Sequence, residues 1–220
     1  MKTDSLFWGI YARCYDSLLR TIPYQRLVDC MVAAVPPGAQ SLFDAGCGTG
    51  NFLQVLQRRR PELALTGLDY SPAMLSRAKA KLPCAKLTCG DLNGPIPYHE
   101  CTFDVVTCVN VLFALANRHE TLRELRRVLK PGGTLILSSP LARPRIHGLI
   151  AEHAKAAGWI QTIPLLFRMS FLLFLNCIII RRGARGQCYF PEMSEVRELF
   201  ENAPVSLVYG NQNWFVCDSK

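Results

Sequence analysis

Apolar runs and amphipathic stretches alternate over most of the chain. The amphipathic stretches repeat with a helical period at 51–60, 71–82 and 118–129, and a fourth follows at 194–203, where Ser194 is placed to cap it. Strands that alternate with helices predict a parallel sheet with helices on both faces. The last two runs flank a Gly-Asn turn and predict a terminal hairpin. The apolar runs that read as strands are 41–45, 63–69, 85–90, 103–110, 134–139, 205–209 and 214–217.

A glycine-rich turn follows the first predicted strand. Asp44 closes that strand, Gly46, Gly48 and Gly50 come at every second position, and Asn51 is a suitable cap for the next helix. Glycine lets a backbone turn sharply and approach a ligand closely. Strand, glycine turn and helix N-terminus together predict a nucleotide-type site at the carboxyl edge of the sheet. The G-x-G-x-G spacing differs from the G-x-G-x-x-G of dinucleotide sites, which argues against a nicotinamide oxidoreductase.

Polar residues also end the second, third and fourth predicted strands. Asp69 lies about 20 residues beyond the glycine turn, where a carboxylate can bind ribose hydroxyls. Asp91 follows the third strand and Asn110 ends the fourth. An acid at a strand end can also be an ordinary cap, but its distance from the glycine turn favours the ribose role for Asp69.

Three stretches resemble the class I S-adenosylmethionine-dependent methyltransferases, in particular the ubiquinone and menaquinone type. They are DAGCGTG at 44–50, LDYSPAML at 68–75 and RVLKPGGTL at 127–135. In the second stretch Ser71 is placed to cap the helix that follows, and the Pro-Gly-Gly of the third predicts a turn. The resemblance implies a Rossmann-like, seven-stranded, mostly parallel sheet with an antiparallel last strand, and S-adenosylmethionine as cofactor. It also implies that Asp91 and the amide of Leu92 bracket the adenine. The cofactor-binding residues that follow from the resemblance are Tyr15, Asp44, Gly46, Cys47, Gly48, Asn51, Asp69, Tyr70, Met74, Asp91, Leu92 and Asn110.

The residues before the sheet form helical patterns that end at Pro36. Within them, YARCYD at 11–16 resembles the Tyr-Asp segment that forms a lid over the cofactor in the same relatives. The alternative is that Tyr11 and Tyr15 only pack a helix onto the sheet. We predict one domain made of a helical lid at 1–38, a cofactor-binding core at 39–140, a helical insertion at 141–190, and a helix and hairpin at 191–220.

The segment 159–182 does not fit the common core. From Ile163 to Ile180 it is almost continuously apolar, and Arg181 and Arg182 follow. Its length is borderline for a membrane span, but a span would separate the last two strands from the rest of their sheet. The segment can instead cover the core, line a pocket for a lipophilic acceptor, or lie on a membrane surface with its arginines at the headgroups. We favour the pocket or the core cover.

Composition adds little to this prediction. The 220 residues suit one domain, and the charge of +8 is scattered without an aromatic-interleaved strip, so no nucleic-acid partner is expected. Ten cysteines without a C-x-x-C pair indicate neither a metal site nor a redox motif. Unpatterned thiols and the absence of a signal-peptide pattern predict a cytoplasmic protein, with peripheral membrane contact through 159–182 as an option.

The sequence thus predicts methyl transfer to a small, lipophilic oxygen, nitrogen or carbon nucleophile by in-line displacement. Such a protein mainly aligns its reactants and excludes water. Tyr15, His147 and His153 are the candidates for a base if one is needed, but nothing in the sequence indicates that any of them points toward the acceptor. The alternative is a methyltransferase-like protein that binds the cofactor without catalysis and acts through a protein partner. The acceptor, the methylated atom and the oligomeric state do not follow from the sequence.

Overall fold

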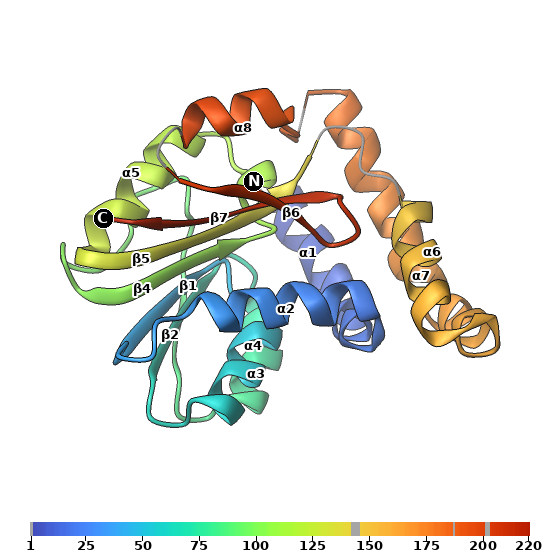
Figure 1. Cartoon of the computed structure of the whole chain (residues 1–220), viewed down its shortest axis with the longest axis horizontal. Helices are drawn as coiled ribbons and strands as arrows, with labels where there is room; N and C mark the ends of the chain where they lie inside the picture. The colour runs from blue at the N-terminus through green and yellow to red at the C-terminus, as the bar shows by residue number, and fades with distance from the viewer. Residues whose placement is uncertain (1, 142–145, 187, 201–202) are drawn as a thin grey trace.

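The sheet has the predicted mixed topology. A computed structural model describes residues 2–141, 146–186, 188–200 and 203–220. Its seven strands run in the order β3-β2-β1-β4-β5-β7-β6 (Figure 1). The first five pair in parallel, and β7 pairs antiparallel with both β5 and β6. The strands are β1 (Ser41–Ala45), β2 (Ala64–Asp69), β3 (Lys86–Cys89), β4 (Phe103–Val109), β5 (Leu129–Pro140), β6 (Val205–Val208) and β7 (Asn213–Ser219).

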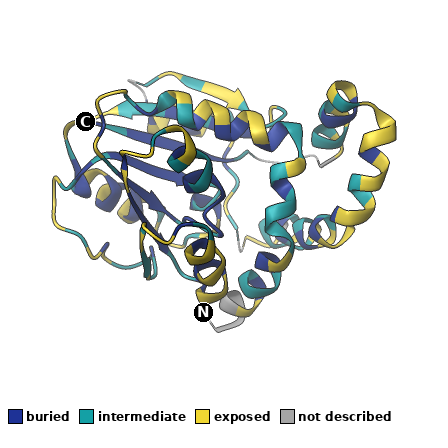
Figure 2. Ribbon diagram, turned by 90° about the horizontal axis from the view of Figure 1, so that it is seen from below, coloured by how far each residue is buried: buried dark blue, intermediate teal, exposed yellow. Residues whose placement is uncertain are grey.

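Helices cover both faces of the sheet, and successive strand residues face opposite layers. Leu42 and Val105 belong to the core layer under one set of helices, whereas Phe43 and Val106 belong to the layer on the other face. Figure 2 shows the buried strands in the interior and exposed residues on the outer faces of the helices. The first layer is covered by α2 (Ile22–Ala34), α3 (Asn51–Arg59) and α4 (Pro72–Lys81), and the second by α5 (Arg118–Val128) and α8 (Met193–Leu199).

Two of the three predicted helix caps are wrong. Ser71 caps α4 as expected, because its hydroxyl accepts from the Met74 amide at 3.4 Å. Asn51 is the first residue of α3 rather than its cap, and Gly50 takes the cap position with a left-handed φ of 76°. At α8 the cap position belongs to Glu192, so Ser194 lies inside the helix. In both cases the backbone enters the helix earlier than the side-chain preference indicates.

The Pro-Gly-Gly segment after α5 is part of β5 rather than a separate turn. β5 pairs with β4 at Leu129, and the pairing resumes at Thr134 after a shift in register between Phe103 and Val105. The intervening residues form a bulge in which Gly132 has a φ of 73°. Glycine is the residue that takes this conformation without strain.

The remaining helices gather at the carboxyl ends of the parallel strands. The N-terminal segment, for which the sequence predicts a lid, consists of α1 (Lys2–Tyr15), a short 3-10 turn η1 (Asp16–Arg20) and α2. α6 (Ile146–Ala157) and α7 (Trp159–Ala184) lie side by side at one end of the molecule (Figure 1). α1 packs against both α4 and α7. Residues of the predicted insertion therefore contact the N-terminal helix α1.

Candidate active site

Nine of the twelve predicted cofactor-binding residues line one pocket, called here the cofactor pocket. It lies where β1, β2 and β4 end, and α1 forms part of its wall through Trp8 and Tyr15. The carboxyl ends of parallel strands are where open α/β sheets bind their ligands. The nine residues are Tyr15, Gly46, Gly48, Asp69, Tyr70, Met74, Asp91, Leu92 and Asn110.

The glycine turn forms the floor of the cofactor pocket. Gly46, Gly48 and Gly50 have φ values of 83°, 55° and 76°, a conformation that side-chain-bearing residues rarely adopt. A Cβ atom on Gly46 would lie 2.3 Å from a methyl carbon of Val111, so glycine is needed there for space as well. The amides of Gly46 and Cys47 both donate to the Leu68 carbonyl, at 2.7 and 3.0 Å. These bonds tie the turn to the end of β2.

Asp69 is held in place by the backbone of two neighbouring segments. Its Oδ2 accepts from the Gly48 amide at 2.8 Å, and its Oδ1 accepts from the Ser71 amide at 2.8 Å. Burial raises the pKa of Asp69, and the two amide bonds act against that rise. Each oxygen keeps a second lone pair for another donor. A carboxylate oriented in this way suits a pair of ribose hydroxyls, as the sequence predicts.

Asp91 presents one carboxylate oxygen to its own loop. Its Oδ1 accepts from the amide and the side chain of Asn93, both at 2.9 Å. No hydrogen bond to Oδ2 is present among the described residues, and Asp91 and Leu92 both line the cofactor pocket. The free oxygen can accept from an amine, which fits the adenine role that the resemblance implies.

The other three predicted residues, Asp44, Cys47 and Asn51, lie beneath the glycine turn instead. They line a smaller cavity that Tyr24 of α2 also lines. Asp44 is buried, and burial together with nearby Asp69 raises its pKa to about 7, although the Thr107 hydroxyl donates to its Oδ1 at 2.7 Å. This cavity shares Tyr15, Gly46 and Asn110 with the cofactor pocket. Asp44 therefore lies at the border of the cofactor pocket rather than on its wall.

Asp16, which follows Tyr15, ties the N-terminal segment to the core. Its Oδ1 accepts from the Thr49 hydroxyl at 2.6 Å and from Lys81 Nζ at 2.7 Å. Lys81 also donates to Asn51 Oδ1 at 2.7 Å. Because Thr49 belongs to the glycine turn and Lys81 ends α4, this cluster of half-buried charges fixes Tyr15 over the cofactor pocket.

A second, apolar pocket adjoins the cofactor pocket and is called here the acceptor pocket. Tyr11 lines it from α1, and the inner face of α7 supplies most of one wall. Among its described lining residues there is no acidic or basic side chain apart from a histidine, His153. The two pockets share Trp8, Tyr15, Asn110, Phe113 and Ile179. The α7 residues in its wall are Thr162, Leu165, Leu166, Met169, Leu173, Asn176, Ile179 and Ile180.

The three candidate bases are placed differently. His147 is exposed and lines neither pocket, whereas buried His153 lines the acceptor pocket. Nδ1 of His153 accepts from the Ile22 amide at 3.2 Å, so the proton of the neutral ring is on Nε2. Burial raises the pKa of Tyr15 well above its usual value, and nearby Tyr24 and Tyr11 add to the rise. His153 and Tyr15 thus present hydrogen-bond donors rather than bases.

Asn110 joins the two pockets in a conformation that is uncommon for a residue with a side chain. Its φ is 57°, its amide donates to the Ser138 carbonyl at 2.8 Å, and its Oδ1 accepts from Asn213 Nδ2 at 2.6 Å. Asparagine tolerates this left-handed region better than most residues. The bonds to β5 and β7 hold the end of β4 in place between the pockets.

Several wall residues were not found from the sequence. Trp8, Ile179 and Arg182 line the cofactor pocket, and the guanidinium of Arg182 lies 4.5 Å from the centre of the Phe7 ring. They come from α1 and α7, which reach the strand ends only through tertiary packing. Among the described residues, no group of three or more histidine, cysteine or acidic side chains could hold a metal ion.

Comparisons with known proteins agree with this geometry. Residues 43–137 match the family described as "Methyltransferase domain". The chain is 32% identical to a Thermotoga maritima demethylmenaquinone methyltransferase over 57% of this chain and 56% of the relative. It is also 32% identical to a Variovorax paradoxus trans-aconitate 2-methyltransferase over 75% of this chain and 62% of the relative. The chain thus spans little more than half the length of these curated relatives.

A solved structure extends the likeness to the whole fold. It is the methyltransferase in a complex with a Haloferax volcanii methyltransferase activator, with a TM-score of 0.63 and 16% identity. The match covers 96% of this chain and 92% of that one. At this identity the likeness concerns the fold alone. From the matched motifs and the pocket that they line, residues 43–137 form a class I S-adenosylmethionine-dependent methyltransferase domain, whose cofactor is S-adenosylmethionine.

Proposed function

We propose that the chain is an enzyme that transfers a methyl group from S-adenosylmethionine to a small, lipophilic acceptor. When bound, the cofactor supplies a methyl group that its sulfonium has already made electrophilic. The glycine turn, Asp69 and Asp91 would hold and orient the cofactor in its pocket. The apolar wall of the acceptor pocket would exclude water and align the nucleophile for in-line displacement.

The observation that carries this proposal is the wall common to the two pockets. Tyr15 and Asn110 belong to the cofactor pocket, to the acceptor pocket and to the cavity beneath the glycine turn. A ligand in the acceptor pocket would therefore lie next to one in the cofactor pocket. Apolar pockets with a few polar groups are typical of small-molecule sites.

The lining of the acceptor pocket favours an apolar acceptor over a multiply charged one. Its described residues offer no lysine or arginine to match carboxylates such as those of trans-aconitate, for which one relative is named. Buried charges need such partners. The menaquinone precursor for which the other relative is named is the better guide to the class of acceptor.

The polar groups of the acceptor pocket orient the acceptor more readily than they deprotonate it. The Nε2 proton of His153 can donate to a carbonyl or hydroxyl oxygen, whereas the phenol of Tyr15 is hydrogen-bonded to Tyr24. Because neither group is placed as a base, the acceptor should be a nucleophile already, such as an enolate, a phenolate or an unprotonated amine.

A labelled-methyl assay tests the proposal. The chain is incubated with labelled S-adenosylmethionine and extracts split into aqueous, lipid and macromolecular fractions, and we expect label in the lipid fraction. Leu165→Gln puts an amide into the acceptor pocket and should lower kcat/KM about tenfold, roughly 1.4 kcal/mol, with unchanged cofactor affinity. The matched control is Leu207→Gln at an exposed position of β6, which should change neither kcat/KM nor cofactor affinity.

Two outcomes contradict the proposal. Label in the aqueous or macromolecular fraction alone would assign a different class of acceptor. No label in any fraction, with calorimetry still showing cofactor binding, would favour the non-catalytic alternative that acts through a protein partner.

A further inference from the structure

The outer face of α7 is an exposed apolar stripe. Its five residues, called here the outer stripe, are spaced three or four apart and so share one side of the helix. Their exposed fractions range from 47% for Phe171 to 90% for Ile160. Figure 2 shows exposed residues along the outer edge of the helices farthest from the sheet. The outer stripe consists of Ile160, Ile163, Phe167, Phe171 and Phe174.

α7 is therefore apolar on two opposite sides. Its inner side is already occupied, because Met169 and Leu173 line the acceptor pocket and Leu172 is fully buried. A surface helix of a globular protein normally carries polar residues on its outer side. An apolar patch of this kind on a protein surface marks a contact with something else.

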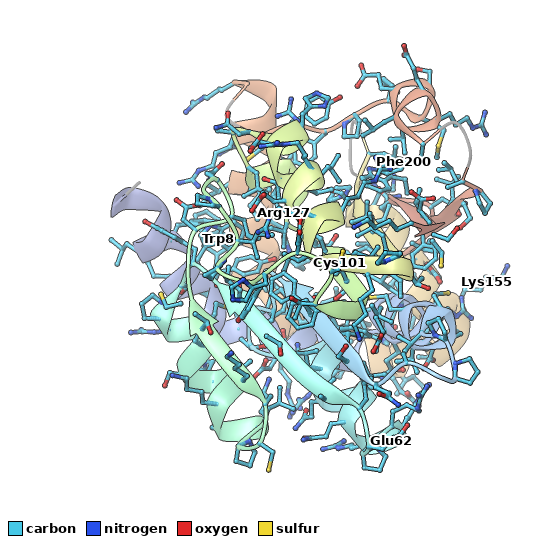
Figure 3. The ribbon with its side chains drawn as sticks, turned by 90° about the vertical axis from the view of Figure 1, so that its left-hand side faces the viewer. Trp8, Glu62, Cys101, Arg127, Lys155 and Phe200 are labelled. Atoms are coloured by element: carbon cyan, nitrogen blue, oxygen red, sulfur yellow. The ribbon has the colours of Figure 1, made fainter. Side chains whose placement is uncertain are left out.

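The segment that carries the outer stripe has charges of one sign only. Residues 154–191 contain five basic residues and no acidic one. Lys155, Arg168, Arg181 and Arg185 are exposed, and none of them forms an ion pair with another described residue. Lys155 of α6 projects from the edge of the molecule (Figure 3). Arg181 and Arg185 continue the spacing of the outer stripe at the C-terminal end of α7.

α7 is long and apolar enough to cross a membrane, but the sheet does not allow it to. The stretch Trp159–Gly183 has the length and the mean hydropathy of a membrane span, and 22% of its most apolar part is buried in the structure. β5 precedes α7 and β7 follows it, yet the two strands pair along seven residue positions. A spanning α7 would put these neighbours on opposite sides of the bilayer, so α7 can only lie along a membrane surface.

We infer that the outer stripe docks on an anionic lipid bilayer. The phenylalanines enter the interface between headgroups and acyl chains, while Arg168, Arg181 and Arg185 meet the negative headgroups. The absence of acidic residues is what selects a lipid surface of this charge over an apolar protein surface. Docking in this way would place the acceptor pocket, which lies behind α7, next to the phase in which a lipophilic acceptor dissolves.

Vesicle binding of the full chain tests this inference without reference to catalysis. The chain is sedimented with vesicles of phosphatidylcholine alone and of phosphatidylcholine with phosphatidylserine, at low and high salt. We expect at least tenfold tighter binding to the anionic vesicles, weakened by salt. The double substitution Phe167→Glu with Phe171→Glu should abolish binding, and Arg168→Glu should weaken it, chiefly on anionic vesicles.

The control is Leu207→Glu, an equally drastic change on exposed β6, which should leave vesicle binding unchanged. Thermal unfolding of each variant confirms that it is folded. Equal binding by the double variant and the wild type would overturn the inference, and so would a folded wild type that binds neither vesicle. A wild-type dimer in light scattering that the double variant converts to a monomer would overturn it in favour of self-association. None of these results bears on methyl transfer itself.

Discussion

The cofactor pocket and the acceptor pocket are built from different parts of the chain. The cofactor pocket rests on backbone geometry: positive φ values at the glycines, and amides of Gly48 and Ser71 that hold Asp69. The acceptor pocket is a space between helices, walled by side chains of α1, α6 and α7. A pocket formed by backbone geometry should lose its ligand affinity when a single residue is substituted. A pocket formed by side chains should keep binding after such a substitution but change which ligands it prefers.

The largest effect is expected at Gly46. Gly46→Ala places a methyl group 2.3 Å from Val111 and strains a φ of 83°, so the glycine turn must move. We expect cofactor affinity in calorimetry to fall at least 100-fold. Gly132→Ala is the control, because its φ of 73° is equally strained but a Cβ there meets no atom within 4 Å. If both variants bind the cofactor alike, the floor of the pocket is not as rigid as the structure implies.

Asp69→Ala should have the next largest effect. It removes both oxygens facing the cofactor pocket and leaves the Gly48 and Ser71 amides without their acceptor. Cofactor affinity should fall by about 1–3 kcal/mol, the cost of leaving such groups unpaired. A folded Asp69→Ala variant with wild-type affinity in calorimetry would remove Asp69 from the cofactor site.

Asp44 should make stability depend on pH. Burial raises its pKa to about 7 in the folded state, above the value of about 3.9 that is usual for an unfolded chain, so the folded state binds a proton more tightly. The free energy of unfolding should therefore fall as pH rises from about 4 to about 7.

Asp44→Asn removes the fall in the free energy of unfolding with pH, because an amide does not titrate, and it keeps an oxygen that accepts from the Thr107 hydroxyl. Without ligand, the variant should exceed the wild type by about 4 kcal/mol at pH 8, roughly 1.36 kcal/mol for each of the three pKa units, and match it near pH 4 in denaturant unfolding. A constant difference between the two proteins at all pH values would show that Asp44 does not titrate in this range.

The smallest effect is expected in the acceptor pocket. His153→Gln loses the imidazole but keeps a donor, so KM for the acceptor should rise about threefold to tenfold while kcat changes little. The control is His147→Gln, which should change neither because His147 lines neither pocket. If turnover instead fell about 100-fold and one limb of the pH profile were lost, His153 would be a general base.

The same contrast explains how much the sequence could predict. The order of strands and helices follows from local periodicity, and Asp69 follows from its distance to the glycine turn. Trp8 and Ile179 carry no comparable signal, because helices distant in sequence bring them to the pocket. The placement of Asp44 and Asn51 beneath the turn, and of His153 with its Nδ1 bonded to α2, likewise depends on tertiary packing.

Local rules also failed where the backbone has more than one way to begin an element. Gly50, with its left-handed φ, takes the cap position of α3, so the helix begins at Asn51 itself. The bulge after Leu129 lets β5 begin directly after α5, where the Pro-Gly-Gly segment predicts a turn. These errors moved boundaries by a few residues and left the topology intact.

The position of β7 has a consequence for the order in which the sheet forms during synthesis. β7 leaves the ribosome after β6 but lies between β5 and β6, so β6 has no partner strand until β7 emerges. Until then the edge of β5 is unpaired and open to other chains. A released chain truncated before residue 213 should therefore be more prone to aggregate, or to need a chaperone, than one that extends through β7.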